Sequence, residues 1–347
     1  MKPKLAITMG DPAGVGAEIT VKALARKEVY DACVPVVIGD WEAMLDALDY
    51  TGNNRLKLRR ISSPEEASGE YGTIDLIDMA FLQPQGWEYK KVGKLTGEAS
   101  FQYVVKGIEL ANEGRIHAVV TGPINKEAIN LAGHHYSGHT EIFADMTHTS
   151  SCAMLLVSKK LKVIHVTTHV SMREACDRVT KERVLEVIHL ADEGGKLMGI
   201  PHPRIGIAGL NAHCSENGLF GFEEERWIIP AVRTAQAEGL TADGPVPPDT
   251  IFVKALAGQY DIVVAMYHDQ GHIPVKLSGF VLDPETNLYS SLSGINTTVG
   301  LPIIRTSVDH GTAFDRAGEG RANEESMLEA LEMAATMANN KFGLSVQ

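Results

Sequence analysis

Short apolar segments alternate along the chain with longer segments whose apolar residues recur every three or four positions. The apolar run at residues 4–9 precedes a helix-like segment at residues 17–29, and the same order recurs until an amphipathic segment at residues 323–340. Short apolar runs predict buried strands, and the longer amphipathic segments predict helices. The alternation therefore predicts an α/β protein with largely parallel sheets.

Two interruptions of this alternation predict the domain organisation. The pattern changes near residues 121–126 and returns near residues 300–307, and residues 282–294 form a polar, turn-rich segment. We expect the last segment to be an inserted loop or hairpin. The two changes predict one discontinuous domain and one inserted domain, with boundaries at residues 1–127 plus 306–347 and at residues 128–305.

The composition narrows the class of protein. The chain has 347 residues, enough for two lobes, and its formal net charge of −12 argues against a general nucleic-acid binder, which needs a basic surface. No apolar run reaches the roughly 18 residues that a membrane span needs. The N-terminal segment reads as a first strand instead of a signal peptide. Four widely spaced cysteines predict reduced thiols in a cytoplasmic protein.

Three histidines follow apolar, strand-like runs at the point where each strand should give way to a loop. They are His169, His213 and His268. Because the carboxyl ends of parallel strands lie along one edge of a sheet, these side chains can converge there. Three imidazoles that leave open positions suit a divalent catalytic metal such as zinc. The alternative is that each histidine only caps a strand end.

A further histidine, His272, stands four positions after His268, which is the spacing of two metal ligands on one helical face. Gly271 and Pro274 argue against a helix here, because proline disfavours the α conformation of the residue before it. We therefore expect His272 in a loop beside the site, outside the set of metal ligands, as a candidate substrate contact.

Glycine-rich and cationic segments are candidates for anion binding. Residues 9–18 contain a glycine-rich turn between a strand and a helix, where backbone N–H groups can approach an anionic ligand. His139 and Thr140 stand at a helix start, whereas Lys276 and Arg305 follow apolar runs. Cations at strand ends suggest a phosphate or carboxylate pocket. A tight turn and solvated surface charges are the plain alternatives.

These segments occur together in an order that resembles the 4-hydroxythreonine-4-phosphate dehydrogenase family. The resemblance runs over essentially the whole chain and rests on the motifs GDPAGVGAE, TGPINK, SGHTE, VTTH, GLNAH, AMYHDQG and GLPIIRTSVDHGTA. That family is related in fold to the isocitrate and isopropylmalate dehydrogenases. The resemblance implies a two-domain α/β fold with parallel and mixed sheets, an active site in the interdomain cleft, and a homodimer.

The resemblance also implies roles for individual residues. A divalent metal (Zn, Mg, Co or Mn) would be bound by His169, His213 and His268, in a site shared across the dimer interface. The phosphorylated substrate would be bound by His139, Thr140, Lys276, Asn296 and Arg305. The cofactor NAD would be bound by Gly10, Asp11, Gly14, Gly16, His310, Gly311, Asp315 and Asn323. An acidic Asp315 would favour NAD over NADP by repelling a 2′-phosphate. Asn323 is also a candidate N-cap of the last helix.

The segment between Phe280 and Asn296 is longer than in the biosynthetic members of the family. This insert and the motif GHIPVK are similar to a branch that acts on D-threonate and D-erythronate 4-phosphate. The implied reaction is NAD- and metal-dependent oxidation at C3 followed by decarboxylation to dihydroxyacetone phosphate and CO₂. The alternative substrate is 4-hydroxythreonine 4-phosphate, the precursor in pyridoxal phosphate biosynthesis.

The proton acceptor and the reaction class leave alternatives open. Asp249 and Lys126 are candidate proton acceptors, although Asp249 could cap a helix and Lys126 could neutralise a pocket. Asp269 is a candidate for orienting a histidine. A metal-dependent hydrolase or aldolase that binds no dinucleotide, and a non-catalytic sugar-phosphate sensor, are the alternatives from other classes. No nucleic-acid or membrane partner is expected.

Overall fold

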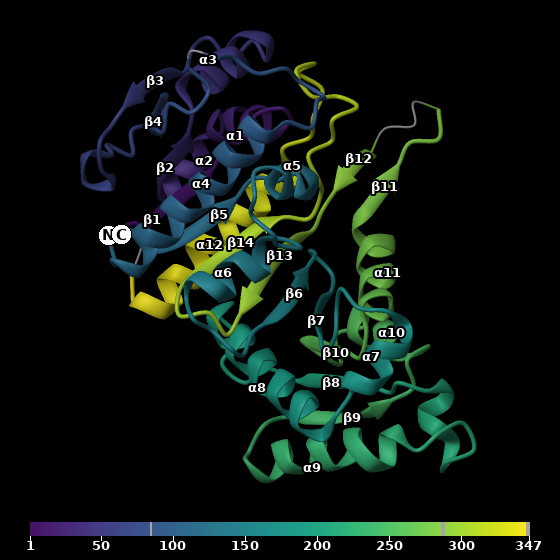
Figure 1. The fold of residues 1–347 in the computed structure, drawn as a ribbon. Coiled ribbons are helices and arrows are strands. Elements are labelled where there is room, and N and C mark those ends of the chain that lie inside the picture. The colour runs from purple at the N-terminus through teal and green to yellow at the C-terminus, as the bar shows by residue number, and fades with distance from the viewer. Residues whose placement is uncertain (84, 286–288, 345–347) are drawn as a thin grey trace. The chain divides into compact units, whose positions relative to one another are not determined.

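The structure is a computed structural model that describes residues 1–83, 85–285 and 289–344 (Figure 1). The chain divides into two compact units. Unit 1 combines residues 1–149 with the C-terminal segment from residue 301, and unit 2 comprises residues 150–300. The predicted boundaries differ from these because the helices of residues 126–146 pack on the long helix of unit 1 and so belong to that unit.

Unit 1 is built on six strands in the order β3-β4-β2-β1-β5-β14, and every pair is parallel. The central strands β1, β2 and β5 are buried on both faces, which explains why they read as continuous apolar runs, whereas the edge strand β3 is polar and largely exposed. The strands are β1 (Lys4–Thr8), β2 (Val34–Gly39), β3 (Lys57–Arg60), β4 (Thr73–Asp78), β5 (Ala118–Thr121) and β14 (Ile304–Val308).

The helices of unit 1 cover this sheet. Helix α4 packs against β1 and β2, and helix α12 packs against β14 and β5. The helices are α1 (Gly16–Leu24), α2 (Lys27–Ala32), α3 (Trp41–Tyr50), α4 (Lys94–Asn112), α5 (Lys126–Leu131), α6 (His139–Met146) and α12 (Glu325–Phe342), with the short η1 (Pro64–Glu66).

Unit 2 contains a mixed sheet in the order β13-β6-β7-β10-β8-β9. The pairs of β6 with β13 and with β7 are antiparallel, whereas β7, β10, β8 and β9 run parallel. The strands are β6 (Ala153–Val157), β7 (Lys162–His165), β8 (Ile205–Ala208), β9 (Ala242–Val246), β10 (Ile262–Ala265) and β13 (Ile295–Val299). The helices are α7 (Met172–Arg178), α8 (Lys181–Leu197), η2 (Ala212–Glu216), η3 (Glu224–Ile228), α9 (Ile229–Ala237), α10 (Ile251–Leu256) and α11 (His268–Gly279).

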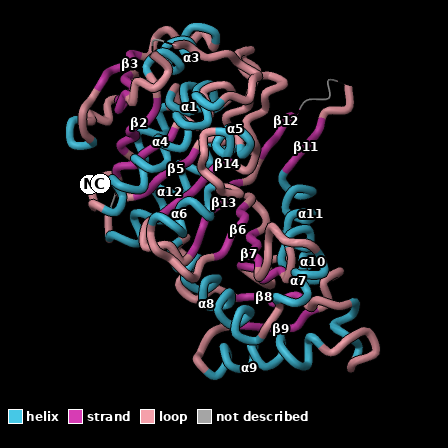
Figure 2. Tube along the Cα trace, viewed as in Figure 1, coloured by secondary structure: helices cyan, strands magenta, loops and turns pink. Residues whose placement is uncertain are grey.

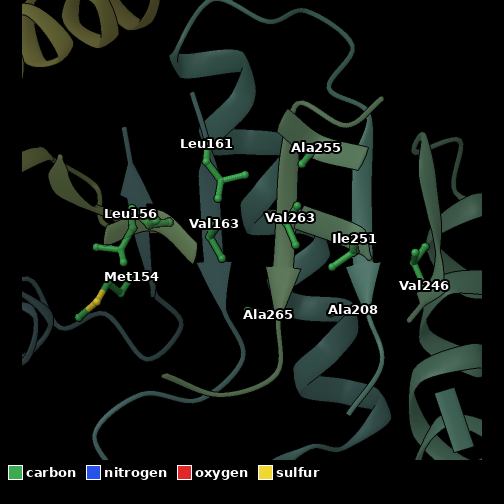
Figure 3. Packing of buried hydrophobic residues seen from close by; sticks show 11 residues of the cluster. Met154, Leu156, Leu161, Val163, Ala208, Val246, Ile251, Ala255, Val263 and Ala265 are labelled. Atoms are coloured by element: carbon green, nitrogen blue, oxygen red, sulfur yellow. The ribbon is translucent and has the colours of Figure 1, made fainter. Parts of the chain in front are cut away.

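A buried apolar cluster fixes the strands of unit 2 that lead to the candidate site. Val163 of β7 and Val263 of β10 pair in register, and Ile251 and Ala255 of α10 belong to the same cluster (Figure 3). Because the strands are locked at their centres by buried side chains, their carboxyl ends are held at fixed positions.

Residues 268–279 form helix α11, so the prediction of a loop at His272 is wrong. Tertiary packing outweighs the helix-breaking tendency of Gly271 and Pro274, because the packed helix has room only for a glycine at position 271. A Cβ there would lie 2.3 Å from Nε2 of His165 and 2.7 Å from a methyl group of Val163. The helix also contains Pro274.

The predicted insert begins where α11 ends. Strands β11 (Phe280–Leu282) and β12 (Tyr289–Leu292) pair antiparallel, so the insert is a hairpin (Figure 2). Residues 286–288 lie outside the described residues. Within the described chain, no helix has the length and apolar character that crossing a membrane requires. All four cysteines are free thiols.

The packing of α4 on α5 gives a stability prediction. A Cβ at Gly97 would lie 2.1 Å from the carbonyl oxygen of Ala128, and backbone cannot yield as a flexible side chain can. We expect Gly97→Ala to lower the free energy of unfolding by about 1–3 kcal/mol, the usual cost of overpacking. Urea denaturation measures this change. Lys106→Ala on the same helix should change it by no more than about 0.5 kcal/mol, and equal effects of both variants would contradict the prediction.

Candidate functional site

Two of the three predicted metal-binding histidines lie together in unit 2. His169 follows β7, and His268 begins α11 after β10. Because β7 and β10 pair parallel and in register, their ends are neighbours, and the two ring centroids are 5.9 Å apart. Both residues line a cavity of about 560 Å³, with Ser171 and Tyr267 among its other lining residues.

The ring of His268 is held by its neighbours on α11. Asp269 Oδ1 lies 2.6 Å from His268 Nδ1, as the role expected for this aspartate requires. The ring of His272 stacks on that of His268, with centroids 3.6 Å apart and planes 12° apart. His272 is only 8% exposed, and its Nδ1 lies 2.9 Å from the carbonyl oxygen of His268. His272 therefore supports His268 from the inside of the unit.

A fourth ring completes this layer. His165, the last residue of β7, is buried and lies 4.8 Å from the ring of His272. Burial, with a smaller contribution from His272, lowers the pKa of His165 to about 3, whereas the carbonyl of Met154 opposes the shift. His165 is therefore neutral at physiological pH, and it packs as a structural residue beneath the two outer histidines.

The third predicted ligand, His213, lies in a strained turn of unit 2. Its φ is +50°, and the four residues that follow also have positive φ. For L-amino acids this left-handed conformation costs roughly 1–2 kcal/mol per residue. The His213 ring is 6.5 Å from that of Phe220. Among the described residues of this single chain, no group of three or more His, Cys, Asp or Glu side chains is arranged to hold a metal.

The chemistry of the donors allows a partial test of the metal prediction. Imidazole nitrogens lie about 2 Å from a bound zinc ion, so two rings that share an ion have centroids roughly 5–6 Å apart. The separation of His169 and His268 fits that requirement. The pair can thus supply two ligands, and a complete site needs a further donor beside them.

Unit 1 contains a group of cations around a buried arginine. Arg305 on β14 is 2% exposed, and its Nη2 donates to Thr121 Oγ1 at 3.2 Å. Burial lowers the pKa of Arg305 to about 9, with Glu141 opposing the shift, so the side chain keeps its charge at neutral pH. Lys126 also belongs to this group, because its charge acts on His139.

His139 begins α6 beside this arginine, and Thr140 is the next residue of the helix. Burial, together with the charges of Arg305 and Lys126, holds the pKa of His139 well below its usual range. Its Nε2 is buried and has no hydrogen-bond partner among the described residues. A neutral imidazole with an unused nitrogen, beside two cations, is suited to an anionic ligand that also carries hydroxyl groups.

The remaining predicted substrate and catalytic residues are distributed over both units. Lys126 is the exposed first residue of α5, whose N-cap Asn125 accepts from the N–H of Ala128. Asp249 is exposed and precedes α10, whose N-cap is Thr250. In unit 2, Lys276 lies on α11 and not at a strand end, and its ammonium group is 4.7 Å from the centre of the Phe280 ring. Asn296 lies on β13.

The two loops predicted to bind NAD are in contact within unit 1. The N–H of Val15 donates to the carbonyl of Thr312 at 3.0 Å, and a Cβ at Gly14 would lie 2.8 Å from that same oxygen. Gly10 has a φ of +81°, and a Cβ there would lie 2.4 Å from the carbonyl oxygen of Pro123. Gly16 is the first residue of α1. The glycines therefore allow the close backbone approach that a dinucleotide site uses.

In the C-terminal loop, Asp315 forms an ion pair with Arg316 at 2.9 Å, so its negative charge is partly compensated. Asn323 accepts from the N–H of Glu325, but the N-cap of α12 is Glu324, so the N-cap prediction is wrong by one position. In the same loop, Nδ1 of His310 lies 2.9 Å from the carbonyl of Gly311.

Sequence reasoning missed two acidic residues that shape these groups. Glu141, two positions after His139 in the SGHTE motif, interacts electrostatically with Arg305. Glu224 is buried below the turn of His213 and accepts hydrogen bonds from Leu210 and Asn211. The motif position could have indicated Glu141, whereas no local signal separates Glu224 from its acidic neighbours in sequence.

Comparisons with known proteins identify the family of the chain. Residues 31–334 match the family described as pyridoxal phosphate biosynthetic protein PdxA. The chain is 46% identical over 340 residues to D-threonate 4-phosphate dehydrogenase of Cupriavidus necator, covering 98% of both chains. It is 47% identical over 335 residues to the enzyme of the same name from Salmonella typhimurium, covering 96% of this chain and 98% of the relative. A crystal structure of 4-hydroxythreonine-4-phosphate dehydrogenase from Klebsiella pneumoniae has a TM-score of 0.84 at 45% identity, covering 97% of this chain and 100% of that chain.

The fold and the comparisons together define the class of protein as an α/β oxidoreductase of the dehydrogenase type. The chain belongs to the PdxA family. The predicted fold class and the predicted family are thereby confirmed.

The buried carboxyl group of the glycine-rich loop gives a pH prediction. Asp11 is fully buried, its Oδ1 accepts from the N–H of Ala13, and burial raises its pKa to about 6. An unfolded aspartate ionises near 3.9. Between these values the folded state binds more protons, so this group's contribution to stability is lost as pH rises from about 4 through about 6.

Asp11→Asn removes this cost and keeps the carbonyl acceptor. We expect the variant to be more stable than the wild type by about 1–3 kcal/mol at pH 7.5 and equally stable near pH 4. Urea denaturation at the two pH values measures the difference. Asp31→Asn, at an exposed position, is the matched control. A gain that is the same at both pH values would contradict the explanation.

Proposed function

We propose that this protein is an NAD- and divalent-metal-dependent dehydrogenase that oxidises and decarboxylates D-threonate or D-erythronate 4-phosphate. The products are dihydroxyacetone phosphate, CO₂ and NADH. The observation that carries the proposal is the group of cations around Arg305. Burying an arginine costs free energy that an anionic ligand can repay.

The cationic group supports a substrate with a phosphate. Arg305 can bind two phosphate oxygens at once, and Lys126 adds a second positive charge. His139 presents a buried nitrogen that a further oxygen of the substrate can use. In unit 2, Lys276 and Asn296 are the further residues proposed to bind substrate, through an ammonium group and an amide.

His169 and His268 would hold the metal, with Asp269 and His272 fixing the ring of His268. When bound, a divalent ion lowers the pKa of a coordinated hydroxyl group and stabilises negative charge on a carbonyl oxygen, which are the needs of the two chemical steps. These histidines would then fix the position of the C3 hydroxyl group of the substrate.

A second copy of the chain would supply the third ligand. The turn that carries His213 is followed by large apolar side chains at the surface, with Leu219 70% exposed and Phe220, Phe222 and Trp227 also exposed. Such a patch is typical of a protein–protein interface. In a two-fold dimer the same surface serves both subunits, so each turn can deliver its His213 to the histidine pair of the partner.

The reaction removes a hydride from C3 and a proton from the C3 hydroxyl group. NAD takes the hydride and becomes NADH. Lys126 and Asp249 are the candidates for the proton acceptor, because Lys126 belongs to the cationic group and Asp249 acts electrostatically on Cys214, next to His213. The resulting β-keto acid then loses CO₂ through cleavage of the bond between C1 and C2, and the enolate that remains takes up a proton at C2 to give dihydroxyacetone phosphate.

The two candidate substrates differ in the substituent at C2, which is a hydroxyl group in one and an amine in the other. The relatives from Cupriavidus necator and Salmonella typhimurium are named for D-threonate 4-phosphate, whereas the Klebsiella structure is named for 4-hydroxythreonine 4-phosphate, which carries an amine at C2. The β11–β12 hairpin between Lys276 and Asn296 is the sequence feature that favours the first substrate.

An activity panel tests the proposal. We expect NADH to form, as followed by its absorbance, with NAD, a divalent metal and D-threonate 4-phosphate. The rate should exceed that with 4-hydroxythreonine 4-phosphate by at least about tenfold, which is about 1.4 kcal/mol of transition-state discrimination. Arg305→Met should lose most of the activity, and Arg321→Met, at an exposed position, should retain it. No NADH with either substrate would contradict the proposal.

Mixed dimers test the shared metal site. His169→Ala and His213→Ala should each be inactive alone. If each site takes His213 from the partner, random reassociation of the two variants makes half of the molecules heterodimers with one intact site each, and about a quarter of the wild-type activity returns. If all three ligands came from one subunit, mixing would restore no activity.

A further inference from the structure

The turn that carries His213 has an unusual backbone. His213, Cys214, Ser215, Glu216 and Asn217 have φ values of +50°, +56°, +66°, +47° and +59°, and none of them is glycine. L-amino acids visit this left-handed region as single residues and not as runs. Such a run persists only where the surrounding structure over-determines it, which is typical of functional sites.

A single buried carboxylate holds this turn. Glu224, the first residue of η3, is 2% exposed. Its Oε1 accepts from the N–H groups of Leu210 and Asn211 at 2.8 and 2.7 Å. Its Oε2 accepts from the side-chain amide of Asn211 at 2.9 Å and from the hydroxyl group of Ser215. Glu224 thus links the residues that enter the turn to the centre of the turn.

The sequence leaves room for this link. A Cβ at Gly209 would lie 2.8 Å from Sγ of Cys214 and 3.3 Å from Oε1 of Glu224. Any larger residue at position 209 would therefore displace both the turn and its anchor. Ser215 is buried on the anchored side, whereas His213 is exposed.

We propose that Glu224 is a positioning residue that, through Ser215 and the backbone of residues 210–211, fixes the direction in which the left-handed turn presents His213. The assignment of His213 as a metal ligand rests on the proposed function, but the anchoring of the turn by Glu224 does not. The positive φ values make the link necessary, because without it the chain would relax toward right-handed conformations and carry the imidazole away.

Two variants weaken the link to different degrees. Ser215→Ala removes only the bond to the centre of the turn, and Glu224→Gln replaces an acceptor oxygen with a donor. Glu225→Gln, one position along at an exposed site, is the control. Hydrogen–deuterium exchange of the full-length, metal-free protein measures the mobility of the turn without any contribution from metal binding. We expect exchange in a peptide spanning residues 209–219 to rise at least about tenfold in both variants and to stay unchanged in the control.

Zinc titration by calorimetry measures the zinc affinity, which under this proposal depends on the direction in which the turn holds His213. We expect Ser215→Ala to weaken zinc binding about tenfold, in the range found when partners that orient a metal ligand are removed. Unchanged exchange would overturn the anchoring by Glu224. Faster exchange with unchanged zinc affinity would overturn the positioning role, and because neither readout uses NAD or substrate, this failure is distinct from a failure of the dehydrogenase assignment.

A glycine substitution separates positioning from stability. Glu216 is exposed with a φ of +47°, so Glu216→Gly relieves strain in the turn. We expect Ser215→Ala to lower the melting temperature as well. Adding Glu216→Gly should restore the melting temperature without restoring zinc affinity, because glycine relieves the backbone strain but does not fix the direction of the His213 side chain. Recovery of both quantities would mean that the link only stabilises the fold, and it would overturn the proposal.

Discussion

In unit 1, the residues of an ion pair on α1 also form hydrogen bonds to the C-terminal loop and so link the two ends of the chain. Glu18 on α1 is fully buried and pairs with Lys22 one helical turn later at 2.7 Å. Lys22 also donates to the carbonyls of Gly320 and Ala322, and Glu18 accepts from the N–H of Ala322. A buried charge requires partners of this kind, and three of these hydrogen bonds form only when the C-terminal loop lies against α1.

This constraint explains why unit 1 is discontinuous in sequence. Strand β14 returns to the sheet beside β5, and α12 covers the strands that the N-terminal half has built. Gly14 of the first loop then meets Thr312 closely enough that a side chain would not fit. The glycine-rich turn and the C-terminal loop are thus one structural feature, although about 300 residues separate them.

Charge is organised differently in the two units. In unit 1 a buried arginine and a neutral histidine form a group suited to a phosphorylated ligand. In unit 2 imidazoles are layered, with the neutral His165 beneath His272 and His268 above. The left-handed turn of His213 differs from both, because the hydrogen bonds of one buried carboxylate hold its strained backbone in place. Each arrangement lowers the stability of the fold at a position that is a candidate for binding.

The α/β class, the strand–helix order and the family can be predicted from the sequence, because apolar periodicity and long ordered motifs are local signals. The sequence also indicated that His169 and His268 follow strands whose ends meet. The tertiary structure decided what depends on packing between distant residues. Helix α11 forms through Gly271 because His165 and Val163 occupy the space that a side chain would need. The unit boundaries follow from the packing of α5 on α4, and the conformation of the His213 turn follows from the hydrogen bonds of Glu224. Neither contact produces a periodic pattern in the sequence from which it could be predicted.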